Sequence, residues 1–367
     1  MMIGISIAGS FPAKIYAAAH RNNLFPGPKS HVRTAAENIP ALSRSTSELS
    51  LKRAIAQPTG SKKIAVILAD FAGADSTTSG SPTMSTADKT TINSMFQHLK
   101  GFYSEASYGR LSLDITFFYE GGSSTSVPAG AITIMVPSTM QVYGTGDEEG
   151  SSENLMLFIY DALKEVNTPS LRLHHDTYDS VIVVHAGYGN ESTSASGDLW
   201  SALIGWQTAT SESYGFIDGL VIPVRESGAS PIGTLCHEFG HVLGLPDVYA
   251  TNTSNGSQVG IWCLMDSGNW NDDGYSPTHP SPWCKQLLGW ITPATLSYTP
   301  TTLAQVYTSS GFMPIEVSSS SVYKILGKGS TAEYYLIAFS STSAYNPNPM
   351  SGGVQIWHVD EGIIDGV

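Results

Sequence analysis

The segment from His237 to Asp247 constrains the fold of this chain more than any other stretch. His237 and His241 are one helical turn apart, so a helix brings both imidazoles to one side and to one metal ion. Glu238 lies on the same helix, and Gly244 lets the chain leave it. Asp247 can then return to the metal. Three protein ligands leave one position open for water, which is the arrangement of catalytic rather than structural zinc.

The residues around this motif favour a helix over about 231–243. Ser230 is a suitable N-cap and Pro231 a suitable first helical residue, because its missing N–H costs nothing there. The predicted apolar face consists of Ile232, Leu235, Phe239, Val242 and Leu243. The alternative interpretation is an amphipathic helix whose histidines are half-buried and bind nothing. Further along, Met265 lies in a predicted tight turn, either beneath the metal or as plain core filling.

Other site candidates are less specific. Asn271–Gly274 is rich in oxygen ligands and is a candidate Ca²⁺ site, although such clusters are also ordinary turns. His174-His175-Asp176 suggests a second metal, but adjacent histidines on a strand point to opposite faces, so a surface loop is favoured. Tyr249 either polarises substrate near the zinc or packs under the loop. Cys263 and Cys284 flank the predicted Met turn and either form a disulfide or stay free, whereas Cys236 is expected to be a buried thiol.

Hydrophobic periodicity predicts an α+β protein with a twisted mixed sheet, two helices backing it and the metal-binding helix below it. The predicted helices cover residues 84–107 and 154–166. The predicted strands cover residues 64–71, 111–119, 131–136, 179–185 and 217–224. After Trp290, short alternating segments at 322–326, 333–339 and 354–359 predict a β-rich extension.

This pattern divides the chain into a leader over residues 1–60, a catalytic domain over 61–295 and the β-rich extension over 296–367. A length of 367 residues is enough for one large domain with an extension. Because the sequence stops soon after the last predicted strand, we expect it to be part of a longer protein.

Charge is unevenly distributed along the chain. Residues 1–63 hold nine of the 18 Lys and Arg residues and only Glu37 and Glu48, a net charge of 9 − 2 = +7, and the remainder carries 9 − 29 = −20. A basic arm can indicate binding to nucleic acid or an anionic membrane, but beside an acidic body an intramolecular latch is equally consistent. No apolar run reaches 18 residues, which predicts no membrane span. We also expect no nucleic-acid partner.

The leader has two open interpretations, an inhibitory pro-segment and a disordered linker. No cysteine precedes Cys236, so a cysteine cannot cap the zinc from the leader. The ligands that the leader can offer instead are His20, His31, Glu37 and Glu48. The apolar start at residues 1–11, followed by small residues at 17–19, predicts a truncated or atypical signal peptide, interrupted by Lys14.

The extended zinc motif with a later Met turn resembles the metzincin clan of zinc endopeptidases. The wider pattern is similar to the immune inhibitor A family of secreted metalloproteases. The resemblance extends over about residues 60–367 and is carried, besides the zinc motif, by residues 63–71, 102–109, 181–187, 285–290, 333–337 and 353–361. It implies a metzincin-like catalytic domain and a secreted zymogen that hydrolyses proteins or peptides, with zinc on His237, His241 and Asp247 and Glu238 as general base and acid.

Three positions depart from these patterns. The common third zinc ligand is His rather than Asp247, many metzincins carry Tyr where this chain has Ser267, and the family tends to carry an acid at Ala250. Two other functions stay open: a surface or adhesion protein that retains the metzincin shell without activity, and a zinc hydrolase of non-peptide bonds. Retention of Glu238 argues against the first of these. The sequence does not predict an oligomeric state or a substrate preference.

Overall fold

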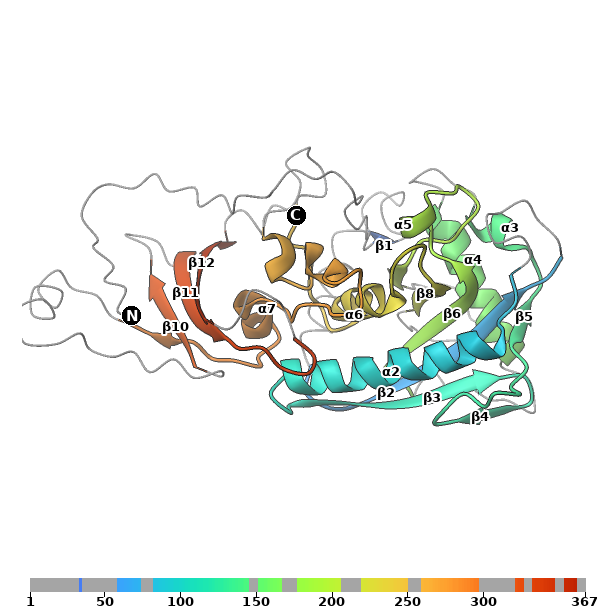
Figure 1. The fold of residues 1–367 in the computed structure, drawn as a ribbon, viewed down its shortest axis with the longest axis horizontal. Helices are drawn as coiled ribbons and strands as arrows, with labels where there is room; N and C mark the ends of the chain where they lie inside the picture. The colour runs from blue at the N-terminus through green and yellow to red at the C-terminus, as the bar shows by residue number, and fades with distance from the viewer. Residues whose placement is uncertain are drawn as a thin grey trace, which may run out of the picture.

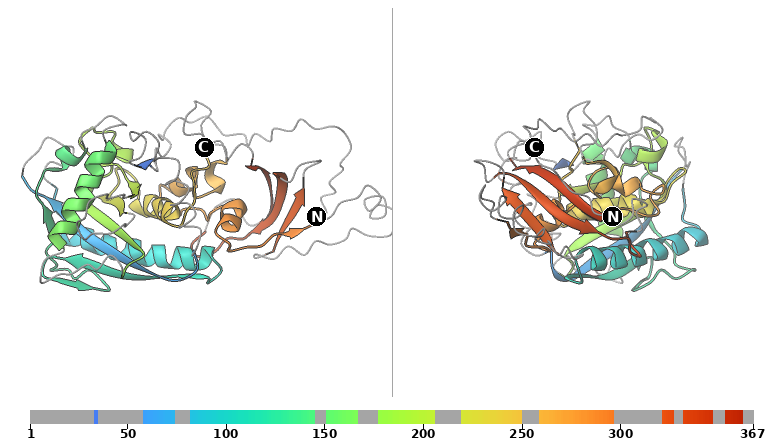
Figure 2. Two further views of the ribbon diagram at one scale, coloured as in Figure 1. Left: turned by 180° about the vertical axis from the view of Figure 1, so that it is seen from behind. Right: turned by 60° about the vertical axis from the view of Figure 1, so that its left-hand side comes forward.

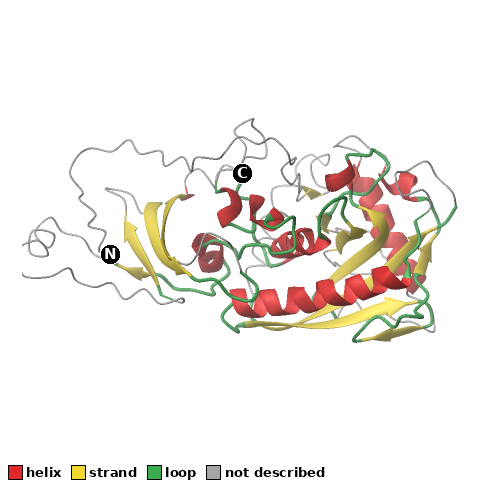
Figure 3. Ribbon diagram, in the orientation of Figure 1, coloured by secondary structure: helices red, strands yellow, loops and turns green. Residues whose placement is uncertain are grey.

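A computed structural model describes residues 33–34, 58–73, 82–144, 151–166, 177–205, 219–249, 259–296, 321–326, 332–346 and 353–361. Two sheets organise these residues (Figure 1). The larger sheet forms one end of the molecule with three principal helices, and a small C-terminal sheet forms the other end (Figure 3). No helix within these ranges is long and apolar enough to cross a membrane.

The larger sheet is mixed, as the sequence predicts. Its strands follow the order β1-β7-β8-β6-β2-β3-β4, and β5 pairs with β2 beyond the end of β3. The pairs β7–β8 and β3–β4 are antiparallel, and the other pairs are parallel. The strands are β1 (Arg33–Thr34), β2 (Gly60–Phe71), β3 (Leu111–Tyr119), β4 (Gly122–Ser124), β5 (Ile134–Val136), β6 (Ser180–Tyr188), β7 (Ala202–Gly205) and β8 (Gly219–Arg225).

Helices cover both faces of this sheet, so its central strands are buried on both sides. α2 (Thr86–Ala106) and α6 (Pro231–Val242) share one face with Ile64, Val66 and Leu68 of β2. α4 (Ser151–Val166) covers the other face, against Ala65 and Ile67 (Figure 2). Burial on both faces explains the continuous apolar run in β2. The two predicted backing helices therefore lie on opposite faces, and one shares its layer with the motif helix.

The hydrophobic patterns of the sequence predict the bounds of most helices and strands to within a few residues. The predicted strands 111–119 and 322–326 agree with the structure at both ends. Only Ile134–Val136 of the predicted strand 131–136 pairs with the sheet. Strands β1, β4 and β7 were not predicted, because two to four residues are too few for a recognisable alternation. His174–Asp176 lies outside the described residues.

The C-terminal part forms a second sheet in the order β12-β11-β10-β9. Its strands are β9 (Ala294–Thr295), β10 (Val322–Leu326), β11 (Glu333–Ser340) and β12 (Gly353–Asp360). One face packs through Tyr334, Leu336 and Val359 against Ile291 and Trp283. Trp283 belongs to α7 (Pro282–Leu287), so the small sheet adjoins the segment that follows the motif helix. The β-rich extension is thus present, while the domain boundary at 295 stays a prediction.

Candidate metal centre

α6 begins and ends at the capping residues from which the sequence predicts its ends. Ser230 Oγ accepts a hydrogen bond from the Ile232 N–H, and Pro231 occupies the first helical position. At the other end Gly244 has a φ of 98°, a left-handed conformation that favours glycine. The N–H groups of Gly244 and Leu245 donate to the carbonyls of His241 and Gly240. This turn redirects the chain so that the following residues run back toward the histidines.

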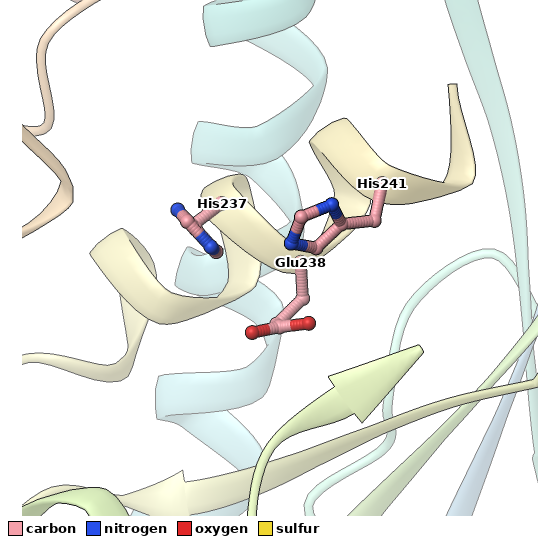
Figure 4. Close-up of side chains that lie close together, drawn as sticks. All are labelled: His237, Glu238 and His241. Carbon is pink, nitrogen blue, oxygen red and sulfur yellow. The ribbon is translucent and has the colours of Figure 1, made fainter. Parts of the chain in front are cut away.

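His237 and His241 point their Nε2 atoms into the same space (Figure 4). The Nδ1 atom of His237 donates to the Leu264 carbonyl at 2.8 Å, and that of His241 donates to the Leu245 carbonyl at 2.7 Å. A carbonyl only accepts, so in each neutral ring Nδ1 carries the hydrogen and Nε2 keeps its lone pair. Both rings are therefore oriented as metal ligands by backbone partners, as is typical of ligating histidines.

Asp247 completes this arrangement. Its Oδ1 atom lies 3.2 Å from Nε2 of His237 and 3.4 Å from Nε2 of His241. Zinc bonds of about 2.0–2.1 Å at tetrahedral angles place ligand atoms roughly 3.3 Å apart. Burial alone would raise the pKa of Asp247, but the two histidines outweigh it and hold that pKa well below its usual value. The carboxylate is therefore ionised.

The donor set fits zinc. Two imidazole nitrogens and one carboxylate oxygen are normal zinc donors. Among the described residues, the buried Nε2 of His241 makes no hydrogen bond, and His237, Glu238 and His241 form the only close group of three potential ligand residues. The structure thus brings together the residues that the sequence singles out.

Glu238 lies beside the ligand atoms and is 1% exposed. The Leu203 N–H of β7 donates to its carboxyl group, while within the described part of the chain its Oε2 atom has no hydrogen-bond partner. Burial raises the pKa of Glu238 to about 8; His237 opposes this rise, and the charges of Asp247 and Glu191 add to it. A bound dication would lower this pKa again, because positive charge favours the carboxylate.

Met265 is fully buried and packs against α6 at Gly240. A Cβ atom on Gly240 would come within 2.6 Å of Met265 Sδ, so α6 and the Met265 side chain pack closely here and a larger residue would force one of them to shift. Asp266 stabilises the turn by accepting the N–H groups of Val259, Gly260 and Ser267. Sequence reasoning missed the role of Gly240, although a glycine inside a helix, which costs about 1 kcal/mol relative to alanine, was the available signal.

The calcium interpretation of Asn271–Gly274 finds no support. Asp272 and Asp273 are exposed and adopt left-handed φ values of 52° and 51°. The carbonyls of Asp273 and Gly274 accept the N–H groups of Ser230 and Gly233 at the start of α6. The turn therefore satisfies the helix N-terminus, which accounts for its sequence without an ion.

The structure shows where the three cysteines and Tyr249 lie but does not assign them a role in the site. Cys263 and Cys284 are buried free thiols whose Sγ atoms lie 3.9 Å apart, and Cys236 is buried in α6. Their pairing on oxidation stays a prediction, which a thiol count on the unreduced, denatured protein would test. Tyr249 is half-buried, and Ala250 lies outside the described residues.

Comparison with known proteins agrees with this geometry. Residues 175–291 match the family model described as "Immune inhibitor A peptidase M6, catalytic domain". This part of the chain belongs to the immune inhibitor A peptidase family. The match contains α6, the Met turn and the strands β7 and β8, which contact α6.

Two curated proteins are distantly similar in sequence to this chain. Pre-pro-metalloprotease PrtV of Vibrio cholerae is 28% identical over 228 residues, covering 52% of this chain and 25% of the relative. Immune inhibitor A of Bacillus thuringiensis subsp. alesti is 27% identical over 237 residues, covering 53% of this chain and 32% of the relative. The chain thus spans a quarter to a third of the length of these relatives.

Proposed function

We propose that this protein is a zinc-dependent endopeptidase that hydrolyses peptide bonds of proteins. One observation carries the proposal: the Nε2 atoms of His237 and His241 converge with Asp247 Oδ1, and the Glu238 carboxyl lies beside them. His237, His241 and Asp247 would hold the metal. The membership of residues 175–291 in a peptidase family supports peptides as the substrate.

Zinc in such a site supplies Lewis acidity, which lowers the pKa of water to about 7 and polarises a carbonyl oxygen. Glu238 is the proton carrier in our proposal. Its ionised carboxylate accepts a proton from the attacking water and delivers it to the leaving amine. The Leu203 N–H fixes this carboxylate from the β7 side, and burial keeps bulk water away from it.

The finer architecture is also part of the proposal. The sheet, α2 and α6, with Met265 packed against α6 at Gly240, support a metzincin-like catalytic domain over residues 61–295. The small sheet supports a β-rich extension over 296–367. The name pre-pro-metalloprotease of one relative supports action outside the cell and a zymogen form, in which residues 1–60 would be the leader.

The deciding experiment compares Glu238→Gln with the wild type on casein or gelatin. We expect peptidase activity to fall by about 100-fold to 10,000-fold, the usual contribution of a general base. Zinc content should stay at one equivalent, because the ligands are intact. Glu165→Gln, which removes an exposed carboxylate from α4, is the matched control. Chelation should abolish wild-type activity, and zinc should restore it.

Two results would favour the alternatives. A wild-type protein that binds zinc and cleaves no protein substrate would support a non-catalytic surface protein. Chelator-sensitive hydrolysis of esters or amides without cleavage of a peptide library would support a non-peptide hydrolase. The same library would define residue preferences on either side of the cleaved bond.

A further inference from the structure

Two buried sulfur atoms meet beside the Met turn, and the zinc chemistry proposed above uses neither. The Sγ atoms of Cys263 and Cys284 lie 3.9 Å apart, and both residues are fully buried. Cys263 lies two residues before Met265, and Cys284 lies in α7. The chain contains one further cysteine, Cys236 in α6. Cys263 and Cys284 are therefore the pair that the structure brings together.

Hydrogen bonds hold the two segments that carry this pair side by side. The Thr278 N–H donates to the Gly268 carbonyl at 2.9 Å. Ser281 contacts both cysteines. Its N–H donates to Cys263 Sγ at 3.4 Å, and its hydroxyl, at the N-cap of α7, accepts the Cys284 N–H at 3.2 Å. Because the backbone fixes both partners, a disulfide bond of about 2.05 Å needs only an approach of the sulfurs by roughly 1.9 Å.

The surrounding redox conditions decide whether two such thiols pair. In a reducing cytosol they persist as small apolar side chains, whereas outside the cell cysteines in contact form disulfides. Action outside the cell is part of the function proposed above, on which this pairing rests. We propose that Cys263 and Cys284 form a disulfide bond in the mature protein.

The oxidation is a thiol–disulfide exchange. Each of the two thiols gives up one proton and one electron, and one S–S bond forms. A disulfide oxidant such as oxidised glutathione takes up both protons and both electrons and becomes two thiols. Because both sulfurs are fully buried in the folded chain, the bond forms while the chain folds.

The bond would hold the Met turn in place, and this turn contacts the segments that carry the proposed zinc ligands. The Leu264 carbonyl, directly after the first cysteine, accepts the Nδ1–H of His237 at 2.8 Å. The Met265 carbonyl accepts the N–H of Val248, the residue after Asp247, at 3.0 Å. A Met turn that is covalently tied to α7 keeps both carbonyls in position. The disulfide is therefore a positioning element of the metal centre.

The first test maps the thiols of the full chain, exported to an oxidising compartment and purified without reductant. The denatured wild type should react with a thiol reagent at Cys236 alone, and at all three cysteines after reduction. Peptide mass spectrometry should find Cys263 linked to Cys284. Three reactive thiols before reduction, or a linkage that contains Cys236, overturns the proposal. The mapping needs no activity, so a disulfide in an inactive protein would reject the peptidase proposal and leave this one intact.

The second test measures what the bond does for the metal. The exported wild type is compared with the same chain produced in a reducing cytosol and kept in a phosphine reductant. Zinc release to a chromogenic chelator should be about 10-fold to 100-fold faster in the reduced chain, the usual effect of losing support around a metal ligand. The melting temperature of the metal-free protein should be lower by about 5–10 °C, because the bond closes the loop between residues 263 and 284.

Cys284→Ser is the matched control for both quantities. Its two preparations should release zinc equally fast and melt at the same temperature, because this variant has no disulfide to lose. If Cys284→Ser does not fold, the two wild-type preparations still decide the question. Equal zinc release from the oxidised and the reduced wild type overturns the positioning role.

Discussion

Asp247 Oδ1 lies 3.2 Å from His237 Nε2, although ten residues and the end of a helix separate the two. The contact depends on the left-handed turn at Gly244, which reverses the chain after α6. The same oxygen lies 3.4 Å from His241 Nε2. One carboxylate therefore lies against both imidazoles from outside the helix that carries them, as we expect of the third metal ligand that we propose.

We expect Asp247→Ala to remove most of the bound zinc. Affinity should fall by more than the roughly 100-fold that loss of an outer-shell partner can cost, because a direct ligand is lost. Zinc per chain after dialysis against a weak chelator measures this. Asp272→Ala, which removes an exposed carboxylate, is the control. Stoichiometric zinc in Asp247→Ala would reject the assignment.

Gly240→Ala should destabilise the protein by about 1–3 kcal/mol, the usual cost of overpacking a core. The added Cβ would lie 2.6 Å from Met265 Sδ, so the buried Met265 side chain or α6 must shift. Gly130→Ala is the matched control, because a Cβ there has no neighbour within 4 Å. Denaturant unfolding of both variants measures the difference. Equal stability would contradict the close contact between α6 and Met265.

The sequence predicted the features that neighbouring residues determine, namely the ends of α6 and the spacing of the motif residues. Ser230, Pro231 and Gly244 delimit α6 through their own backbone preferences, and the spacing of His237, Glu238 and His241 follows from the helical repeat. The spacing to Asp247 also allowed a return toward the histidines, and the structure places the Asp247 carboxylate beside both rings, while its role as a metal ligand stays a prediction. These features depend on about 20 consecutive residues.

The features that the sequence did not predict depend on contacts between segments that are far apart in the chain. Glu191 and Glu226 meet through strand order, and the pairing of β1 with β7 joins residues more than 150 positions apart. The Leu264 carbonyl that orients His237 leaves no side-chain signal at all, because any residue offers a carbonyl. Such features become visible only once the topology is known.

A chain lacking residues 1–56 should have higher peptidase activity than the full chain. β1 (Arg33–Thr34) extends the sheet beside Ile204 and Gly205 of β7, whose neighbour Leu203 donates to Glu238. His20, His31, Glu37 and Glu48, the metal-capping candidates of this leader, lie outside the described residues. The truncation keeps the Pro58 carbonyl that accepts the Trp290 Nε1–H. Initial rates on a fluorogenic peptide measure the effect, and equal rates would dispose of an inhibitory leader.

Stability should fall as the pH drops from about 6.5 to 4, with His185 as one cause. Burial lowers the pKa of His185 to about 4, although its hydrogen bond to the Ala186 carbonyl opposes this shift. The unfolded chain binds this proton near pH 6.5, so above that pH the contribution of His185 is complete. Between pH 6.5 and 4 the unfolded state binds more protons, and about 3 kcal/mol is lost.

His185→Phe tests this assignment, because phenylalanine keeps a ring beside Phe71 and Phe158 but cannot titrate. Unfolding free energies are compared at pH 7 and pH 5 in chelator, so that zinc release does not contribute. The decrease should be smaller in His185→Phe than in the wild type. His358→Phe, which replaces a half-exposed histidine, should retain the full decrease. His279, whose pKa burial also lowers to about 4, accounts for part of the slope that remains. An unchanged slope in His185→Phe would show that His185 is not a source of the acid sensitivity.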